Sequence, residues 1–145
     1  MKIYLDTCVI QRPFDDKSQP RIALESEAAI ALISLCEQGA FELVASDALL
    51  FEQEQNPNPR RKEFSRQILR LAKHLVISDD KVLQLAMEWN SRGLALLDAL
   101  HLASAIVGNA DYFCTTDRKL LNRAQQVGSS VIKIISPIEL AKELA

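Results

Sequence analysis

Acidic residues follow apolar runs at points where a chain of alternating strands and helices would bring them together. Asp6 ends a short apolar run over residues 2–5, and Asp117 follows the run over residues 112–115 by two positions. Glu52 lies nearly two turns into the helix expected after the second strand. Open parallel sheets bind ligands outside the carboxyl ends of their strands, so these acids predict a site at that edge.

Asp98 joins this group from an apolar segment, residues 95–107, that precedes the fourth expected strand. No Lys or Arg stands three or four residues away along the sequence to pair with it. A carboxylate on such a helix is costly unless a charge or several donors meet it. Asp98 is therefore either a first-turn residue held by the helix dipole or a ligand that faces a polar pocket.

Taken singly, these acids also have simpler interpretations. Asp6 and Asp117 are suited to cap a turn or a helix, and Glu52, close to Glu54, is typical of a solvated helix face. Taken together they would repel, since two unit charges about 4 Å apart interact by roughly 4 kcal/mol at an effective dielectric constant near 20. Such a cluster needs cations or protons, and Mg²⁺, which prefers oxygen ligands and retains waters, suits it best.

The elements that must position these acids alternate along the chain. The alternation predicts an α/β fold with one parallel sheet and helices on both faces, in a single domain over residues 1–145. Residues 11–20 are expected to form a loop. The expected strands cover residues 2–5, 41–45, 75–77, 112–115 and 131–135. The expected helices cover residues 21–38, 47–55, 60–73, 79–91, 95–107 and 117–126, with a last one from Pro137.

The composition excludes several classes of protein. A net charge of −2 gives no overall field toward nucleic acid or anionic lipid, so any such binding must be local. We expect no membrane span and no signal peptide, and therefore a cytoplasmic protein. Three cysteines without a CxxC spacing disfavour a disulfide framework or a zinc site, and we expect reduced, mostly buried thiols.

Four short motifs, spread over nearly the whole chain, resemble those of the PIN-domain nucleases. They are Asp6-Thr7, Ser46 with Glu52 six residues later, Leu97-Asp98-Ala99-Leu100-His101-Leu102-Ala103, and Thr115-Thr116-Asp117. The resemblance implies an α/β/α sandwich whose parallel five-stranded sheet has the order 3-2-1-4-5. It also implies a ribonuclease site that depends on Mg²⁺ or Mn²⁺.

The resemblance assigns roles to single residues. It implies three metal ligands, Asp6, Asp98 and Asp117, with Glu52 completing an acidic quartet. It implies that Thr7 and Thr115 orient carboxylates or waters by hydrogen bonds. The residue after Thr7, often Asn in relatives, is Cys8 here, which removes one hydrogen bond that helps to fix the site.

The small members most similar to this chain in length are bacterial toxins of the VapC type. That similarity implies an RNA substrate, an antitoxin protein as partner and a homodimer, for which Phe51 and Leu94 are candidate exposed apolar contacts. The alternative is a catalytically silent PIN module that binds RNA or a partner protein. Because all four acids are present, we favour the enzyme.

Basic residues near the acids predict contacts to the RNA backbone on both sides of the cleavage point. They are Arg12, Arg60, Arg61, Lys62, Arg118 and Lys119. Phe14 is interpreted as an anchor of its loop rather than a base-stacking residue. His101, one turn after Asp98, is interpreted as a core or interface histidine.

Overall fold

Five parallel strands form the centre of the molecule. The computed structural model describes residues 1–127 and 131–144. The sheet has the order β3-β2-β1-β4-β5, and every neighbouring pair is parallel, which confirms the expected topology. The strands are β1 (Lys2–Leu5), β2 (Glu42–Ser46), β3 (His74–Val76), β4 (Tyr112–Cys114) and β5 (Lys133–Ile135).

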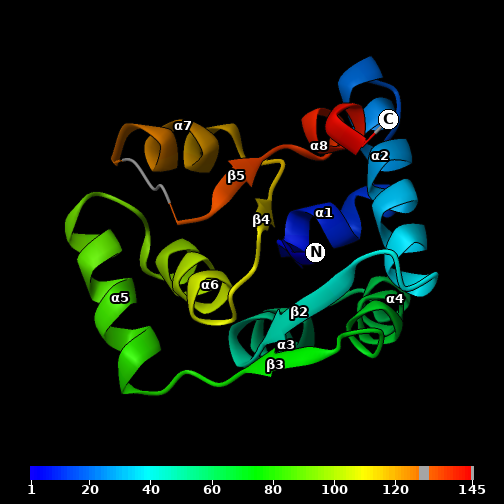
Figure 1. The fold of residues 1–145 in the computed structure, drawn as a ribbon. Coiled ribbons are helices and arrows are strands. Elements are labelled where there is room, and N and C mark those ends of the chain that lie inside the picture. Colours follow the sequence, from blue (N-terminus) through cyan, green and yellow to red (C-terminus); the bar gives the residue numbers. More distant parts are fainter. Residues whose placement is uncertain (128–130, 145) are drawn as a thin grey trace.

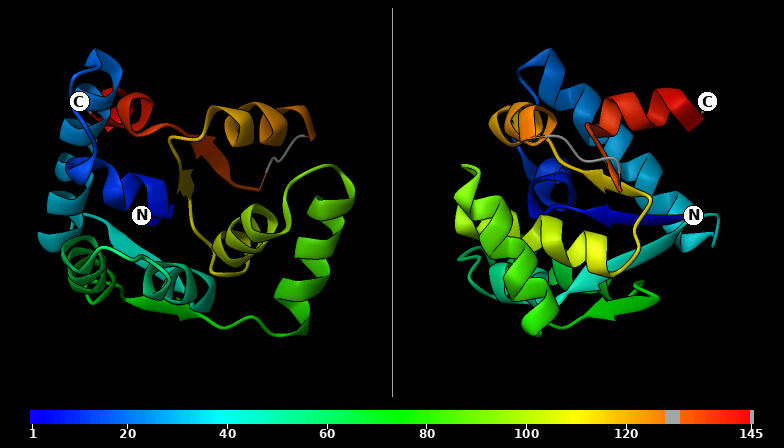
Figure 2. Two further views of the ribbon diagram at one scale, coloured as in Figure 1. Left: turned by 180° about the vertical axis from the view of Figure 1, so that it is seen from behind. Right: turned by 60° about the vertical axis from the view of Figure 1, so that its left-hand side comes forward.

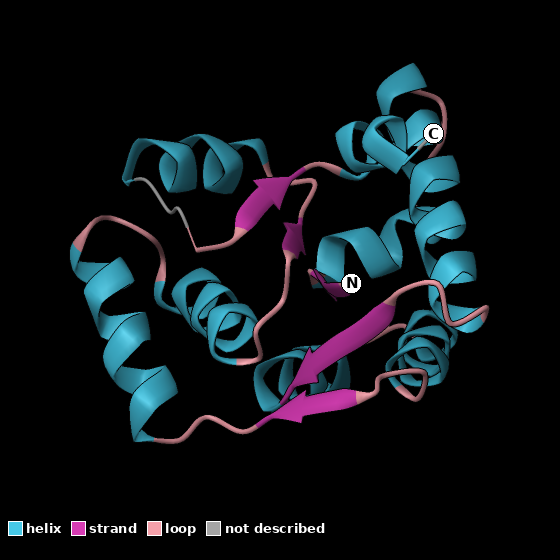
Figure 3. Cartoon of the chain, in the orientation of Figure 1, coloured by secondary structure: helices cyan, strands magenta, loops and turns pink. Residues whose placement is uncertain are grey.

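Helices cover the sheet from two sides. Figure 1 shows α1, α2, α4 and α8 on one side and α5, α6 and α7 on the other, and Figure 2 repeats this division from behind. The secondary structure along the chain, drawn in Figure 3, alternates as expected. The helices are α1 (Thr7–Gln11), the 3₁₀ helix η1 (Arg12–Phe14), α2 (Pro20–Glu37), α3 (Asp47–Glu54), α4 (Pro59–Leu69), α5 (Asp80–Ser91), α6 (Leu96–Val107), α7 (Arg118–Val127) and α8 (Pro137–Leu144).

The side chains on both faces of the central strand β1 are buried. Ile3, Tyr4 and Leu5 are fully buried, as the continuous apolar run predicts for a parallel strand between two helical layers. The Tyr4 ring stacks on Phe113 of β4 with 5.4 Å between ring centroids. This packing fixes the two strands whose carboxyl ends lead to Asp6 and Asp117.

The segment after β1 differs from the expectation. Residues 7–14 form α1 and η1, although no helix was expected before residue 21 and residues 11–20 were expected to form a loop. The Asp6 side chain accepts a hydrogen bond from the Thr7 amide and so caps α1, which outweighs the strand preference of Val9 and Ile10. Other boundaries shift by a few residues, the largest change being that the helix expected over 60–73 ends at Leu69.

Helix α6, which carries Asp98 and His101, packs closely on the sheet. A Cβ atom on Gly108 at its C-terminal end would lie 2.8 Å from Val76 and 2.9 Å from Val44, so only glycine allows this approach. Leu94, just before α6, is buried at 3% exposure, which makes its expected role as an exposed dimer contact wrong. Among the described residues, no helix has the length and apolar character that a membrane crossing requires.

Candidate metal centre

Asp6 lies at the carboxyl end of the central strand, almost completely buried. Its Oδ1 accepts the Thr7 amide at 2.9 Å, and its Oδ2 accepts the Thr115 hydroxyl at 2.8 Å. Burial raises the pKa of the Asp6 carboxyl, an effect that His101 and Thr115 oppose and that the Glu52 carboxylate reinforces. Asp6 is thus a cap that also presents a desolvated carboxylate to its neighbours.

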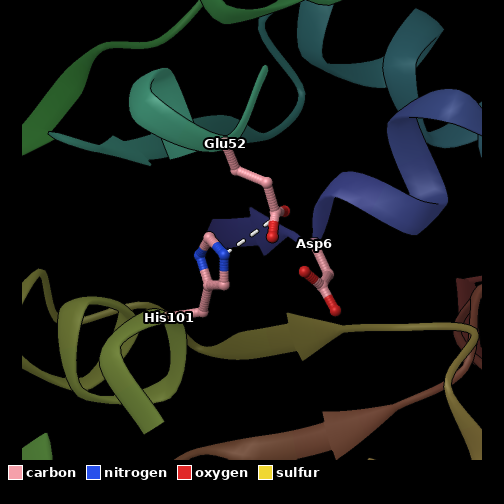
Figure 4. A group of neighbouring side chains, drawn as sticks. All are labelled: Asp6, Glu52 and His101. Atoms are coloured by element: carbon pink, nitrogen blue, oxygen red, sulfur yellow. Dashed lines mark ion pairs between the residues drawn. The ribbon is translucent and has the colours of Figure 1, made fainter. Parts of the chain in front are cut away.

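Glu52 reaches the same place from α3 and His101 from α6, as Figure 4 shows. His101 Nε2 lies 3.4 Å from Glu52 Oε1. Burial raises the pKa of the Glu52 carboxyl, but the contacts with His101 and Thr7 lower it by more, so the net shift is downward. One ligand atom from each of Asp6, Glu52 and His101 lies within 4.8 Å of the other two.

A buried chain of hydrogen bonds holds His101 in place. Its Nδ1 lies 2.7 Å from the Tyr4 hydroxyl, which lies 2.6 Å from the Ser46 hydroxyl. Ser46 Oγ also accepts the Leu49 amide at 3.1 Å, which makes Ser46 the cap of α3, the helix that carries Glu52. This series of hydrogen bonds therefore couples the position of the imidazole to the start of α3.

Asp98 and Asp117 line a cavity of about 250 Å³ next to this group, together with Lys119. Asp98 lies in the first turn of α6 and is half-buried. Burial raises the pKa of its carboxyl, and the nearby carboxylates of Asp6, Asp117 and Glu52 raise it further, while His101 lowers it. The four expected acids therefore act on one another electrostatically, although they come from four segments of the chain.

Asp117 is the most exposed of the four acids. Its Oδ1 accepts the amides of Lys119 and Leu120 at 2.9 and 3.2 Å, so it caps α7, as its simpler interpretation predicts. Its own amide donates to the Thr115 hydroxyl at 3.2 Å. Since Thr115 also donates to Asp6, a single hydroxyl links two of the acids.

Cys8 fills the position that follows Thr7. Its Sγ lies 3.3 Å from the Thr115 hydroxyl and 3.5 Å from Asp6 Oδ2, and it accepts the Thr116 amide at 3.3 Å. Burial and the Asp6 carboxylate raise the pKa of this thiol to about 12. A neutral thiol thus replaces part of the polar support at this position. All three cysteines are free.

The donor set suits a divalent cation. Within residues 1–127 and 131–144, none of the four acids has a Lys or Arg within ion-pair distance. His101 Nε2 is buried and has no hydrogen-bond partner of good geometry in the described part of the chain. Carboxylates that repel one another beside an unsatisfied buried nitrogen are stabilised by a metal ion, so these residues fit one.

Half of the six expected RNA-binding cations already have carboxylate partners. Arg12 pairs with Asp15 at 2.8 Å and with the buried Glu25 at 2.9 Å. Arg61 also pairs with Asp15, at 2.9 Å, and Lys62 pairs with Glu54 at 3.2 Å. The other three, Arg60, Arg118 and Lys119, are exposed and form no ion pair with any described residue.

His101 is the site residue whose role the sequence did not reveal. It is buried at 1% exposure, in agreement with a core histidine, yet its Nε2 faces Glu52. Its apolar neighbours indicated packing, and only the spacing of three residues after Asp98 placed it on the same side of the helix. That spacing is the one signal that points to its role.

Comparisons with known proteins agree with this fold. The family model of the PIN domain matches residues 3–126. The chain therefore belongs to the PIN-domain family, whose members are generally metal-dependent nucleases. No curated protein matches.

Two solved structures share the fold at low sequence identity. The VapBC2 structure from Rickettsia felis, bound to a DNA fragment from its promoter, is 14% identical with a TM-score of 0.59. That alignment covers 94% of this chain and 98% of the other. PAE2754 from Pyrobaculum aerophilum is 18% identical with a TM-score of 0.52, over 99% of this chain and 89% of the other.

Proposed function

We propose that this protein is an endoribonuclease that hydrolyses RNA phosphodiester bonds with Mg²⁺ or Mn²⁺. The observation that carries the proposal is the convergence of Asp6, Glu52, Asp98 and Asp117 without a neutralising Lys or Arg in the described chain. Membership of the PIN family supports the same chemistry.

In this proposal Asp6 and Glu52, whose ligand atoms converge, hold the metal ion. Asp98 joins them from the neighbouring cavity, whose wall also carries Asp117. A bound divalent ion supplies an acidified water and neutralises charge on the phosphate. Thr115 orients Asp6 through its 2.8 Å hydrogen bond. Glu52 is partly exposed, and its lowered pKa keeps its carboxylate ionised and available as a ligand.

The RNA backbone would approach along cations that have no carboxylate partner. Lys119 lines the cavity with Asp98 and Asp117, and Arg118 is its exposed neighbour. Arg60 borders an open hollow of about 600 Å³ that also exposes Phe14, whose ring packs against Phe64 with centroids 5.0 Å apart. We assign phosphate binding first to these three cations, and to Arg12, Arg61 and Lys62 only where RNA displaces their carboxylates.

We also infer a cytoplasmic protein that pairs with an antitoxin. The likeness to a VapBC complex supports an antitoxin partner, and Phe51, exposed at 63%, offers an apolar contact for a homodimer. The competing function is a silent module that binds RNA without cutting it. It predicts RNA binding that is independent of added metal ions.

Cleavage of a labelled single-stranded RNA tests the proposal. The wild type should cut the RNA with Mg²⁺ or Mn²⁺ and stop in EDTA, and either metal ion should raise its Tm. Asp98→Asn should lose both cleavage and the Tm increase. Asp80→Asn is the matched control, because Asp80 is also a first-turn acid but lies on α5, outside the site.

Two outcomes would overturn the proposal. Metal-dependent cleavage retained by purified Asp98→Asn contradicts the assignment of the site. RNA that is bound but never cut by the wild type, with either metal ion, supports the silent module instead.

A further inference from the structure

We propose that His101 is a direct metal ligand, so that Asp6, Glu52 and His101 form a mixed nitrogen and oxygen centre that favours Mn²⁺ over Mg²⁺. The proposal rests on the metal dependence of the proposed function and adds a ligand to its acidic residues. It also chooses between the two cations named in the proposed function.

The geometry around His101 Nε2 is the first argument. This nitrogen lies 3.4 Å from Glu52 Oε1, and a ligand atom of Asp6 completes a group within 4.8 Å. Figure 4 shows the imidazole and both carboxylates directed toward a common space between α3, α6 and the end of β1. Three donors from three elements around one space provide the partial coordination shell that a metal ion needs.

The hydrogen bonding of the ring is the second argument. A histidine that serves only packing normally satisfies both nitrogens, whereas Nε2 of His101 is buried without a well-formed hydrogen bond. Nδ1 is engaged by the Tyr4 hydroxyl at 2.7 Å. In metal sites, a ligand histidine donates its other ring N–H to a fixed acceptor, which sets the tautomer and aims the free nitrogen.

Tyr4 can serve as the fixed acceptor for Nδ1–H because its own position is fixed. It is fully buried, it stacks on Phe113, and its hydroxyl lies 2.6 Å from Ser46 Oγ. With Nδ1–H donating to Tyr4, and Tyr4 donating to Ser46, the lone pair of Nε2 is left facing the carboxylates. The buried hydrogen bonds through Tyr4 and Ser46 therefore hold the imidazole in the orientation that metal binding requires.

A nitrogen ligand changes which ion the site selects. Mg²⁺ binds oxygen ligands and keeps its waters, while imidazole suits the transition metals and Mn²⁺ accepts both donor types. We therefore expect Mn²⁺ to bind more tightly than Mg²⁺. Loss of the imidazole should weaken Mn²⁺ binding by at least about tenfold and Mg²⁺ binding much less.

Pulsed electron paramagnetic resonance on Mn²⁺-loaded protein tests the ligand directly. The chain has only two histidines, His74 and His101, so ¹⁵N-histidine labelling makes any histidine coupling to Mn²⁺ assignable. The wild type and His74→Gln should show the coupling, and His101→Asn should lose it. His74 is the matched control because it also contacts a glutamate, with Nε2 3.3 Å from Glu42 Oε1, but lies on β3.

Calorimetric titration with Mn²⁺ and with Mg²⁺ gives the second measurement. The ratio of the two affinities should fall in His101→Asn and stay unchanged in His74→Gln. Tyr4→Phe, which removes the hydroxyl that positions Nδ1 while keeping the stacked ring, should lower the ratio by a smaller factor. Tyr4→Phe and the labelled wild type decide the matter even where His101→Asn does not fold.

The failure of this inference is distinguishable from failure of the proposed function. Metal-dependent RNA cleavage by a wild type without histidine coupling overturns the ligand assignment and leaves the nuclease in place. Histidine coupling in a protein that never cleaves RNA supports the assignment and overturns the nuclease. A wild type that binds Mg²⁺ but no Mn²⁺ overturns the ligand assignment alone, and one that binds neither ion overturns both.

Discussion

Two groups of carboxylates differ completely in their surroundings. The paired carboxylates, Asp15, Glu25 and Glu54, each contact an Arg or Lys within 3.2 Å. The unpaired carboxylates, Asp6, Glu52, Asp98 and Asp117, have no such contact among the described residues. The first group joins elements of the fold together, and the second concentrates negative charge that no Lys or Arg of the described residues compensates.

The difference shows which acids serve the fold and which are available to a ligand. Arg12 joins η1 to α2 through Glu25, and Arg61 joins α4 to the end of η1 through Asp15. In the unpaired group, burial and repulsion between the carboxylates instead raise the pKa of Asp6 and Asp98. Neutralising an unpaired acid should therefore cost activity, while neutralising a buried paired acid should cost stability.

Asp6→Asn should produce the largest effect. We expect RNA cleavage with Mn²⁺ to fall by about a thousandfold, which corresponds to roughly 4 kcal/mol of lost transition-state stabilisation. The Tm of the metal-free protein should stay the same or rise, because one of four repelling charges is gone. Asp16→Asn, at an exposed acid after η1, is the control and should cleave normally. A large fall in Tm would contradict the comparison.

Glu25→Gln should show the opposite behaviour. Glu25 is buried at 4% exposure and pairs with Arg12, so its loss leaves a poorly compensated guanidinium between α2 and η1. We expect about 3 kcal/mol of destabilisation and a Tm lower by about 10 °C, measured by thermal and urea unfolding. Glu27→Gln, an exposed position on the same helix, should change little. An unchanged Tm in Glu25→Gln would show that the pair contributes nothing to stability.

Thr115→Val tests the hydroxyl that connects two unpaired acids. It removes the donor to Asp6 and the acceptor for the Asp117 amide. Loss of such support should weaken Mn²⁺ binding by about tenfold, as read by calorimetry. Thr115→Ser keeps the hydroxyl and should restore most of the affinity. Equal losses in both variants would assign the effect to the methyl group instead.

Glu54→Gln should give the smallest effect, because its pairs with Lys62 and Arg66 are exposed. Hydrogen bonds from Arg66 and Lys62 lower the pKa of Glu54 to about 2. A lowered pKa adds stability that is present above the unfolded-state pKa and is lost as the pH falls through the folded-state value. The Tm difference between wild type and variant, a few degrees at most, should therefore shrink between about pH 5 and pH 2. A difference that grows in acid would contradict the sign.

Much of the site could be predicted because strand ends are visible in the sequence. Asp6 and Asp117 follow apolar strands directly, and the sheet order then brings them together. Helix α1 was missed because Thr7, Val9 and Ile10 favour strands, and the capping hydrogen bond that overrides them involves the same Asp6 that the site uses.

Contacts between distant segments were not predictable in this way. Arg12, Arg61 and Lys62 cluster near the acids along the chain, but only the folded arrangement shows that carboxylates within the protein already bind them. The role of His101 could not be predicted for a similar reason. Its apolar neighbours describe the side of α6 that packs, and the Tyr4 hydroxyl that orients its ring is 97 residues away.

The cap that Asp6 forms on α1 gives the protein an internal reporter. Oδ1 of Asp6 accepts the Thr7 amide, and that amide proton therefore senses any change in the charge of the carboxylate. A cation that draws electron density from Asp6 lengthens this bond at the first turn of the helix. The Thr7 amide resonance, followed by NMR during titration with a diamagnetic metal ion, thus directly measures the fraction of sites that hold the ion. The measurement requires neither a substrate nor a variant.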